Sequence, residues 1–282
     1  MKDSQEKCGI ISITGFPNSG KSTLINNLTN SKVSIISPKA QTTRIAIKGV
    51  LNIDKSQIIF IDTPGILKPK SFLDKNMTRA IHRTFDESDI NLVMYDARKK
   101  MNSFEEKTLI NLLSKHKKNI LLINKIDLVQ KYKLLEISKD INKIIRFEDT
   151  YMISALKKKG FNDLIESIKK KIPKKNWIYK KEIISDQKLD FMLSEITREK
   201  IFQLLNQELP YSVRIESKII KKKTLYKVFQ YIFVTKKSQK PILIGKNGEK
   251  IKEIGSRARI DMEKKLKSKV FLDILVSQER SK

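Results

Sequence analysis

The octapeptide Gly15-Phe16-Pro17-Asn18-Ser19-Gly20-Lys21-Ser22 matches the phosphate-binding pattern G-x-x-x-x-G-K-[ST]. It follows an apolar run at residues 10–13 that is typical of a buried strand. It precedes Leu24, Ile25 and Leu28, which are spaced as one face of a helix. Strand, glycine-rich turn and helix is the arrangement in which backbone N–H groups bind phosphate. The alternative, a chance glycine turn, does not explain this context, so we predict an α/β nucleotide-binding domain.

The loop assigns expected roles to its residues. Lys21 is expected to reach the β- and γ-phosphates, and Ser22 is expected to offer its hydroxyl to Mg²⁺. The glycines allow the intervening backbone to turn its N–H groups inward. The predicted phosphate-binding residues are Gly15, Phe16, Pro17, Asn18, Ser19, Gly20, Lys21, Ser22 and Thr23.

A second motif selects the base. Asn124-Lys125-Ile126-Asp127 follows the apolar run 120–123, which places it at the carboxyl end of a strand. The Asp127 carboxylate can accept hydrogen bonds from the ring N–H and the exocyclic amine of guanine, whereas adenine presents the wrong pattern, so GTP is favoured over ATP. Asn124 is expected to brace neighbouring loops, and Lys125 to lie over the purine. The predicted guanine-binding residues are Asn124, Lys125, Asp127, Ser154 and Ala155.

Two segments between these motifs fit the switch loops of a GTPase. Asp62-Thr63-Pro64-Gly65-Ile66 ends the apolar strand 58–61, so that Asp62 can hold Mg²⁺ through water and the Gly65 N–H can sense the γ-phosphate. The first switch is expected at 37–44, where Thr42 or Thr43 can close on Mg²⁺, with Thr43 preferred. The predicted magnesium ligands are Ser22, Thr43 and Asp62.

Ile66 stands where Ras-type GTPases place the glutamine that orients the attacking water. A hydrocarbon side chain cannot hydrogen-bond water, and no other side chain of these motifs is a convincing general base. We therefore expect slow intrinsic hydrolysis that depends on electrostatics, on positioning and on help from elsewhere than this side chain.

Composition favours a polyanionic partner. The 282-residue chain has 59 Lys and Arg against 31 Asp and Glu, a formal net charge of +28. By count along the sequence, residues 1–170 have 31 basic against 18 acidic side chains, and residues 171–282 have 28 against 13. The second part therefore carries more excess charge in fewer residues. RNA, DNA and anionic membrane surfaces attract such a field. Lysine-rich genomic bias is the alternative.

Other features limit the class of protein. A single cysteine, Cys8, permits no intramolecular disulfide, and two histidines make a protein metal cluster improbable. No apolar run approaches the ~18 residues of a membrane span, and no signal peptide precedes the phosphate loop. We therefore expect a cytoplasmic protein without a transmembrane segment.

Strands and helices alternate to about residue 171 and then change order. This predicts a doubly wound GTPase domain at 1–171, a linker at 172–187 and a smaller α+β domain at 188–282. In the second domain we expect a helix over 188–209, two strands beginning near Tyr211 and Leu225, a Gly245-Lys246-Asn247-Gly248 loop, a basic helix and a last strand.

This order, with a G-x-x-G loop before a basic amphipathic helix, suggests a KH module, in which the loop approaches a nucleic-acid backbone and bases occupy an adjacent groove. The alternatives are a plain turn and a solvated helix face. The predicted RNA-binding residues are Gly245, Lys246, Asn247, Gly248, Lys250, Lys252 and Arg257.

The two-domain combination resembles the Era family of bacterial GTPases, on the stretches G-F-P-N-S-G-K-S, P-K-A-Q-T-T-R, D-T-P-G-I, N-K-I-D and G-K-N-G-E-K-I-K. The resemblance implies GTP and GDP as ligands with Mg²⁺, and a partner in 16S rRNA near its 3′ end. It also implies a role in assembly of the small (30S) ribosomal subunit, RNA-stimulated hydrolysis and loose association with the inner membrane. It further implies that Asn18 helps to bind K⁺, although a loop-shaping role is equally compatible. Asn247 departs from the glycine that is more usual there.

Three alternative functions remain open on sequence grounds. The first is a nucleotide-gated RNA-binding scaffold with little turnover, which Ile66 keeps open. The second is a GTPase of tRNA modification or large-subunit assembly, and the third is a regulator at the membrane surface.

Overall fold

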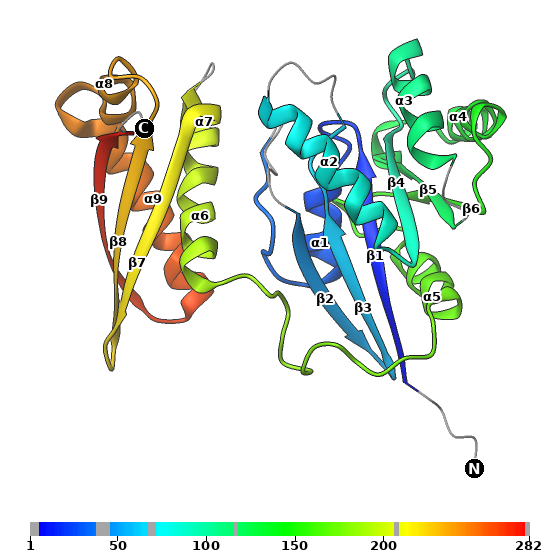
Figure 1. Cartoon of the computed structure of the whole chain (residues 1–282), viewed down its shortest axis with the longest axis horizontal. Coiled ribbons are helices and arrows are strands. Elements are labelled where there is room, and N and C mark those ends of the chain that lie inside the picture. The colour runs from blue at the N-terminus through cyan, green and yellow to red at the C-terminus, as the bar shows by residue number, and fades with distance from the viewer. Residues whose placement is uncertain (1–5, 38–45, 67–71, 115–117, 206–208, 280–282) are drawn as a thin grey trace. The chain divides into compact units, whose positions relative to one another are not determined.

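The computed structural model describes residues 6–37, 46–66, 72–114, 118–205 and 209–279, with the backbone alone at 72–77 and 80. The chain forms two compact units (Figure 1). Apart from residues 35–39, the first unit runs to Asp186 and the second begins at Gln187. Within the described ranges no helix is long and apolar enough to cross a membrane.

The first unit is built on a six-stranded sheet with the order β2-β3-β1-β4-β5-β6. Only β2 is antiparallel to its neighbour, which makes the sheet mixed. The parallel strands bring their carboxyl ends to one edge, where open α/β sheets bind ligands. The strands are β1 Lys7–Gly15, β2 Ile47–Ile53, β3 Ser56–Asp62, β4 Ile90–Asp96, β5 Asn119–Asn124 and β6 Asp149–Ile153.

Helices cover both faces of this sheet, because successive residues of a buried strand point to opposite sides. Leu92 and Met94 of β4 pack in the cluster with helices α1 and α5, whereas Val93 and Tyr95 pack in the cluster with α2, α3 and α4. The predicted doubly wound α/β fold is thus confirmed. The helices are α1 Lys21–Leu28, α2 Phe72–Asp86, α3 Ser103–Leu113, α4 Lys131–Ile144 and α5 Phe161–Lys171, with a 3₁₀ turn η1 at Ile126–Leu128.

The segment after α5 lies along the edge of the sheet. We call residues 172–186 the strap. Gln57 of β3, fully buried, holds its middle: the side-chain oxygen accepts from the N–H groups of Ile178 and Tyr179, and the side-chain nitrogen donates to the Tyr179 carbonyl. Farther along, the Val50 N–H donates to the Ile184 carbonyl at 2.7 Å. The strap therefore belongs to the first unit by its hydrogen bonds.

The second unit is a three-stranded sheet with the order β7-β8-β9, in which β7 and β8 are antiparallel and β8 and β9 are parallel. Helices α6 and α9 cover one face through two apolar clusters. The elements are α6 Leu189–Leu204, α7 Leu209–Ser212, β7 Val213–Lys221, β8 Leu225–Val234, α8 Gln239–Ile244, η2 Lys246–Gly248, α9 Glu249–Leu266 and β9 Lys269–Gln278.

Some local expectations were wrong. The helix expected over 188–209 ends at Leu204, and Tyr211 lies in the short helix α7 rather than in a strand, because Pro210 suits a first helical turn and cannot donate to a sheet. The sequence reading also omitted β2 and α4.

Replacing Gln57 tests how firmly the strap is held. Gln57→Ala removes an amide and leaves buried backbone groups of the strap unpaired, each costing ~1–3 kcal/mol. We expect urea unfolding of the first unit to show about 3 kcal/mol less stability, and limited proteolysis to cleave within 172–186. Gln130→Ala, at an exposed position, is the matched control. Equal stability of the two variants would contradict this account.

Candidate nucleotide site and nucleic-acid interface

The phosphate loop depends on glycine at both ends. Gly15 and Gly20 have φ of +150° and +105°, a region that L-residues rarely adopt. A Cβ on Gly15 would lie 2.3 Å from the Met94 carbonyl oxygen, and a Cβ on Gly20 would lie 2.3 Å from the Asn124 side-chain nitrogen. Helix α1 begins at Lys21, directly after Gly20. The loop therefore presents a helix N-terminus at the sheet edge, where anions are favoured.

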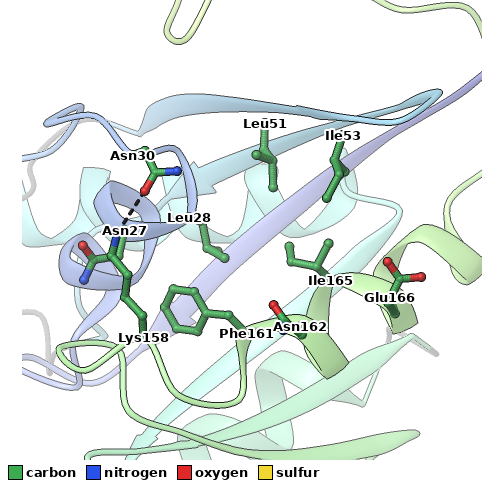
Figure 2. A pocket seen from close by; sticks show the side chains of 10 residues that line it. All are labelled: Asn27, Leu28, Asn30, Leu51, Ile53, Lys158, Phe161, Asn162, Ile165 and Glu166. Atoms are coloured by element: carbon green, nitrogen blue, oxygen red, sulfur yellow. Dashed lines mark hydrogen bonds between the residues drawn. The ribbon is translucent and has the colours of Figure 1, made fainter.

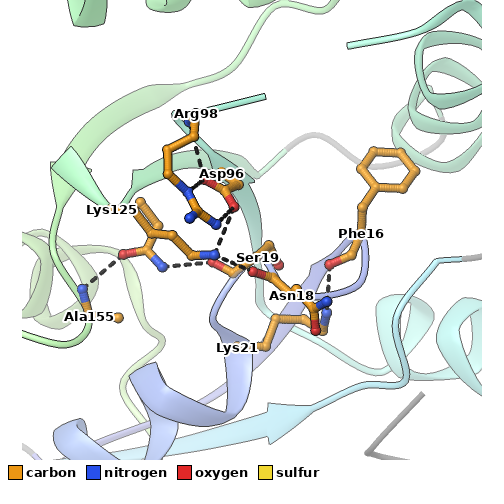
Figure 3. Close-up of polar contacts among 9 residues, drawn as sticks. Phe16, Asn18, Ser19, Lys21, Asp96, Arg98, Lys125 and Ala155 are labelled. Carbon is orange, nitrogen blue, oxygen red and sulfur yellow. Dashed lines mark hydrogen bonds and ion pairs between the residues drawn. The ribbon is translucent and has the colours of Figure 1, made fainter. Parts of the chain in front are cut away.

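Lys21 is buried beneath this loop. Its ammonium donates to the Gly15 carbonyl at 3.0 Å. It also donates to the Phe16 carbonyl at 3.2 Å (Figure 3). Burial lowers the pKa of Lys21 to about 8, a shift that Asp62 opposes and Lys99 reinforces. Neutral carbonyls compensate a charge poorly, so phosphate oxygens would be the stronger partners for this ammonium.

Oxygen ligands suited to Mg²⁺ meet beside Lys21. The Ser22 hydroxyl donates to Asp62 Oδ2 at 2.8 Å, and the buried Ser34 hydroxyl donates to the same oxygen at 2.7 Å. Mg²⁺ prefers hard oxygen ligands and is commonly held by one or two protein groups together with phosphates and water. Ser22 and Asp62 fit that donor set, and Ser34 orients the carboxylate. Sequence reasoning missed Ser34 because a serine at this distance has no motif.

The second switch starts at the end of β3. Thr63 donates from its N–H and its hydroxyl to the Ile13 carbonyl, and Gly65 lies against the ring of Pro17. The Ile66 N–H donates to the Gly15 carbonyl, while its side chain packs in the apolar cluster with Phe16. Pro64, which stands between Thr63 and Gly65 in the sequence, is buried. The predicted first-switch residues Thr42 and Thr43 lie outside the described residues.

Asn124 connects the phosphate loop to the predicted guanine loop. Its buried amide donates to the Ser19 carbonyl at 2.7 Å and accepts from the Ala155 N–H at 2.8 Å. The Ser154 side chain is buried and accepts from the Lys157 N–H, so it shapes the loop from inside. Asp127 lies exposed in η1, three residues beyond Asn124. An exposed carboxylate there is free to meet a base.

Asp96 is a site residue that sequence reasoning missed. It ends β4 directly beside Asn124, and its carboxylate accepts from Lys125 Nζ at 2.7 Å and from two nitrogens of Arg98 at 2.8 and 3.0 Å (Figure 3). Hydrogen bonds from Arg98 and Lys125 hold the pKa of Asp96 at about 2 although burial opposes them. Lys125 Nζ also donates to the Asn18 carbonyl at 2.6 Å. Asp96 therefore fixes the lysine expected to cover the purine.

A hollow of about 360 Å³ lies elsewhere on the first unit, between α1, β2 and α5 (Figure 2). Leu28 and Ile165 on its wall belong to the main apolar cluster, and Leu51 and Phe161 pack against that cluster. Among the residues that the structure describes, none of those predicted to bind nucleotide lines it. The hollow is therefore a surface depression at the edge of the apolar core and not the nucleotide site.

In the second unit the G-x-x-G loop joins α8 to α9. Gly245 and Gly248 have φ of +77° and +79°, and Asn247 between them has φ of +52°. A Cβ on Gly245 would lie 2.6 Å from Lys250 Cβ, whereas a Cβ on Gly248 would meet nothing within 4 Å. Gly248 therefore leaves open space where a nucleic-acid backbone can approach. Lys246 is exposed beside it.

A groove of about 300 Å³ runs between α9 and β9. Lys252 lines it, but Lys250 and Arg257 both pair with Glu253 outside it. The groove also contains residues that sequence reasoning did not select; a helical spacing of three, four and seven from Lys252 would have found Gly255, Ser256 and Arg259. Its lining residues are Ile251, Lys252, Gly255, Ser256, Arg259, Leu272 and Ile274.

Comparison with known proteins agrees with this geometry. Residues 10–125 match the family model described as a 50S ribosome-binding GTPase, and residues 199–280 match the KH domain model. The GTPase Era of Carboxydothermus hydrogenoformans is 39% identical over 274 residues, which cover 96% of this chain and 92% of that protein. The chain belongs to the Era family of GTPases. The GTPase Era of Sinorhizobium medicae is 37% identical over 96% of this chain and 88% of its own length.

Two solved Era structures share the whole architecture. One holds MgGDPNP and nucleotides 1506–1542 of 16S ribosomal RNA, and the other is an Aquifex aeolicus Era variant bound to GDP and AlF₄⁻. Each is 36% identical to this chain, with a TM-score of 0.93 over 98% of this chain and 95% of the solved chain. The prediction of an Era-type GTPase with a C-terminal KH domain is confirmed.

Asp96→Asn tests the hold on Lys125. The amide keeps the volume but removes the charge that fixes Lys125, and a hydrogen bond between charged groups contributes about 1.5–3 kcal/mol. We expect GDP to dissociate roughly tenfold faster in stopped-flow measurements with a fluorescent GDP analogue. Asp140→Asn on α4, an exposed position, makes the same charge change and should leave the rate unaltered. A wild-type rate for Asp96→Asn would contradict the positioning role.

Lys21 predicts a pH dependence of nucleotide binding. With its pKa lowered to about 8, the amine loses its proton above pH 8 in the free protein, whereas bound phosphates favour the charged form. Nucleotide binding must then take up a proton, so GDP affinity should fall between pH 8 and 9.5, by at most tenfold per pH unit. Lys99→Ala removes a charge that lowers this pKa and should move the inflection upward. A flat titration calorimetry profile across this range would contradict the assignment.

Proposed function

We propose that this protein is a GTP-hydrolysing switch that binds 16S rRNA near its 3′ end and acts in assembly of the small ribosomal subunit. The observation that carries the proposal is the presence of a guanine-nucleotide site and a KH groove in one Era chain. A solved relative with the same architecture holds MgGDPNP and the 3′-terminal segment 1506–1542 of 16S rRNA. The GTP form is proposed to favour RNA binding, and hydrolysis to release the RNA.

Different residues of the first unit are proposed to bind the phosphates, Mg²⁺ and guanine. Lys21 and the N–H groups of the phosphate loop bind the phosphates, and Ser22 and Asp62 would hold Mg²⁺, which neutralises charge on the β- and γ-phosphate oxygens when bound. Asp127 selects guanine, and Asp96 holds Lys125 in place. Because Ile66 is packed in the core, catalysis rests on positioning and electrostatics, and its rate is expected to depend on RNA.

The family description and the solved complex name different ribosomal subunits. The family model that names the 50S particle covers only residues 10–125, which lack the KH module. The relatives that match both units are Era proteins, and the RNA in the solved Era complex is 16S, the RNA of the small subunit. The small subunit is therefore the better proposal.

A membrane-surface role is the second candidate, carried by the net charge of +28. We propose a cytoplasmic protein whose contact with an anionic membrane is peripheral. Such contact depends on total charge, whereas RNA binding depends on the loop and groove, so one substitution separates the two.

Gly248→Asp provides that separation. The new carboxylate would stand in the open space beside the loop and repel a phosphate backbone, with a roughly tenfold or greater loss of affinity for a 3′-terminal 16S oligonucleotide. Gly248→Asn is the matched control, because Asn tolerates a positive φ and carries no charge. Binding to vesicles containing anionic lipid should barely change. An equal loss of RNA and vesicle binding would contradict the KH assignment.

A further inference from the structure

The exposed face of the second unit's sheet carries a row of aromatic side chains. Along β8, Val228, Gln230 and Ile232 are fully buried toward α6 and α9, so the alternating residues lie on the opposite face. In chain order these residues are Lys227, Phe229, Tyr231 and Phe233. This face lies across the sheet from the α9–β9 groove, whose floor is Leu272 and Ile274.

The neighbouring strands extend this row into a surface. The register places Lys218 of β7 and Asp273 of β9 on either side of Phe229. In the same way it places Leu275 beside Tyr231. Tyr231 is 39% exposed, Phe271 50% and Leu275 56%, although such side chains are mostly covered in a folded domain. We call the set Phe229, Tyr231, Phe233, Phe271 and Leu275, with Lys218 and Lys227, the aromatic sheet face.

The rings of this face differ in how far they are covered. The Arg214 guanidinium lies 4.3 Å from the centre of the Phe233 ring, which shows that a flat group can stack there. Phe229 and Phe271 meet edge to face, with their centres 6.4 Å apart. Tyr231 has no aromatic or cationic partner among the residues that the structure describes. Tyr231 and the exposed side of Phe271 are therefore available for stacking.

Charge on this face favours a polyanion at one end. Lys218 and Lys227 form no ion pair within the described part of the chain, and Lys222 and Lys223 follow in the adjoining turn. Arg214 pairs with both Glu216, which lies opposite Tyr231, and Glu279, and Asp273 is a further carboxylate on this face, so the excess of positive charge is confined to the end with Lys218 and Lys227. Exposed aromatic side chains on a sheet with basic residues beside them are how several folds bind single-stranded RNA, with bases on the rings and phosphates near the cations.

We propose that the aromatic sheet face is a second binding surface for single-stranded RNA, separate from the α9–β9 groove. Bases stack on Tyr231 and Phe271, and the phosphates pass Lys218 and Lys227. Stacking accepts every base, so this surface binds without strong sequence preference and extends the length of RNA that one chain holds. Binding at this surface needs no contact with the G-x-x-G loop. The proposal can therefore be tested separately from the proposed function.

The test uses the full chain and a fluorescein-labelled oligouridine of twelve nucleotides. The Gly248→Asp background obstructs the groove loop and leaves the sheet face as the remaining surface. In that background, Tyr231→Ala together with Phe271→Ala should lower the affinity roughly tenfold or more. Leucine at position 231 keeps the apolar area but cannot stack on a base. The Tyr231→Leu, Phe271→Ala double variant should therefore lose as much oligouridine affinity as the double alanine variant. In the wild-type chain, 4-thiouridine RNA should cross-link to peptides containing Tyr231 or Phe271.

Asp273→Asn is expected to raise RNA affinity, a result that a misfolded variant would not give. Removing the opposing carboxylate should strengthen oligouridine binding about two- to threefold at low salt, whereas Asp140→Asn, the same charge change on α4, should not. Cross-links confined to α9, or equal affinities for these two variants, would overturn the proposal. The proposal would also be overturned if the Tyr231→Ala, Phe271→Ala variant had a lower sedimentation coefficient but an unchanged RNA affinity. That result would mean that the face joins two copies of the chain. Loss of the 16S oligonucleotide by Gly248→Asp tests the proposed function independently of these results.

Discussion

One buried amide, the side chain of Asn124, constrains the whole nucleotide site. It joins the Ser19 carbonyl of the phosphate loop to the Ala155 N–H of the predicted guanine loop, two segments that are far apart in sequence. The same amide leaves no room for a side chain at position 20, so Gly20 is required by this contact as well as by its φ. Because β4, β5 and β6 align Asp96, Asn124 and Ile153 in register, the phosphate and base subsites are built on one rigid edge.

The two lysines at that edge, Lys21 and Lys125, have different hydrogen-bond partners. Burial lowers the pKa of Lys21, whose direct hydrogen-bond acceptors among the described residues are the neutral carbonyls of Gly15 and Phe16, so phosphate would be its stronger partner. Lys125, by contrast, is already paired with Asp96 and is held before any base arrives. If both lysines bind nucleotide as proposed, Lys21 gains most from the ligand, whereas Lys125 is already positioned for it, and preorganisation reduces the ordering cost of binding.

The fold class and the nucleotide motifs were predictable because their chemistry permits few substitutes. A phosphate loop needs glycine at fixed positions, and guanine needs a carboxylate after a strand. Asp96 was not predictable, because an aspartate at a strand end is common and its partners come from distant segments. In α9, basic residues lie on several sides of the helix, so the sequence did not distinguish Lys252 in the groove from Lys250 and Arg257 outside it. Only the position of β9 decides between them.

The central claim is that one chain joins a guanine-nucleotide switch to RNA recognition. The most direct test is steady-state GTP turnover in potassium buffer, measured alone, with an oligonucleotide matching the 3′ end of 16S rRNA, and with a scrambled sequence of the same length. The account predicts slow turnover alone and strong stimulation by the matching RNA only. No stimulation, or equal stimulation by the scrambled sequence, would contradict it.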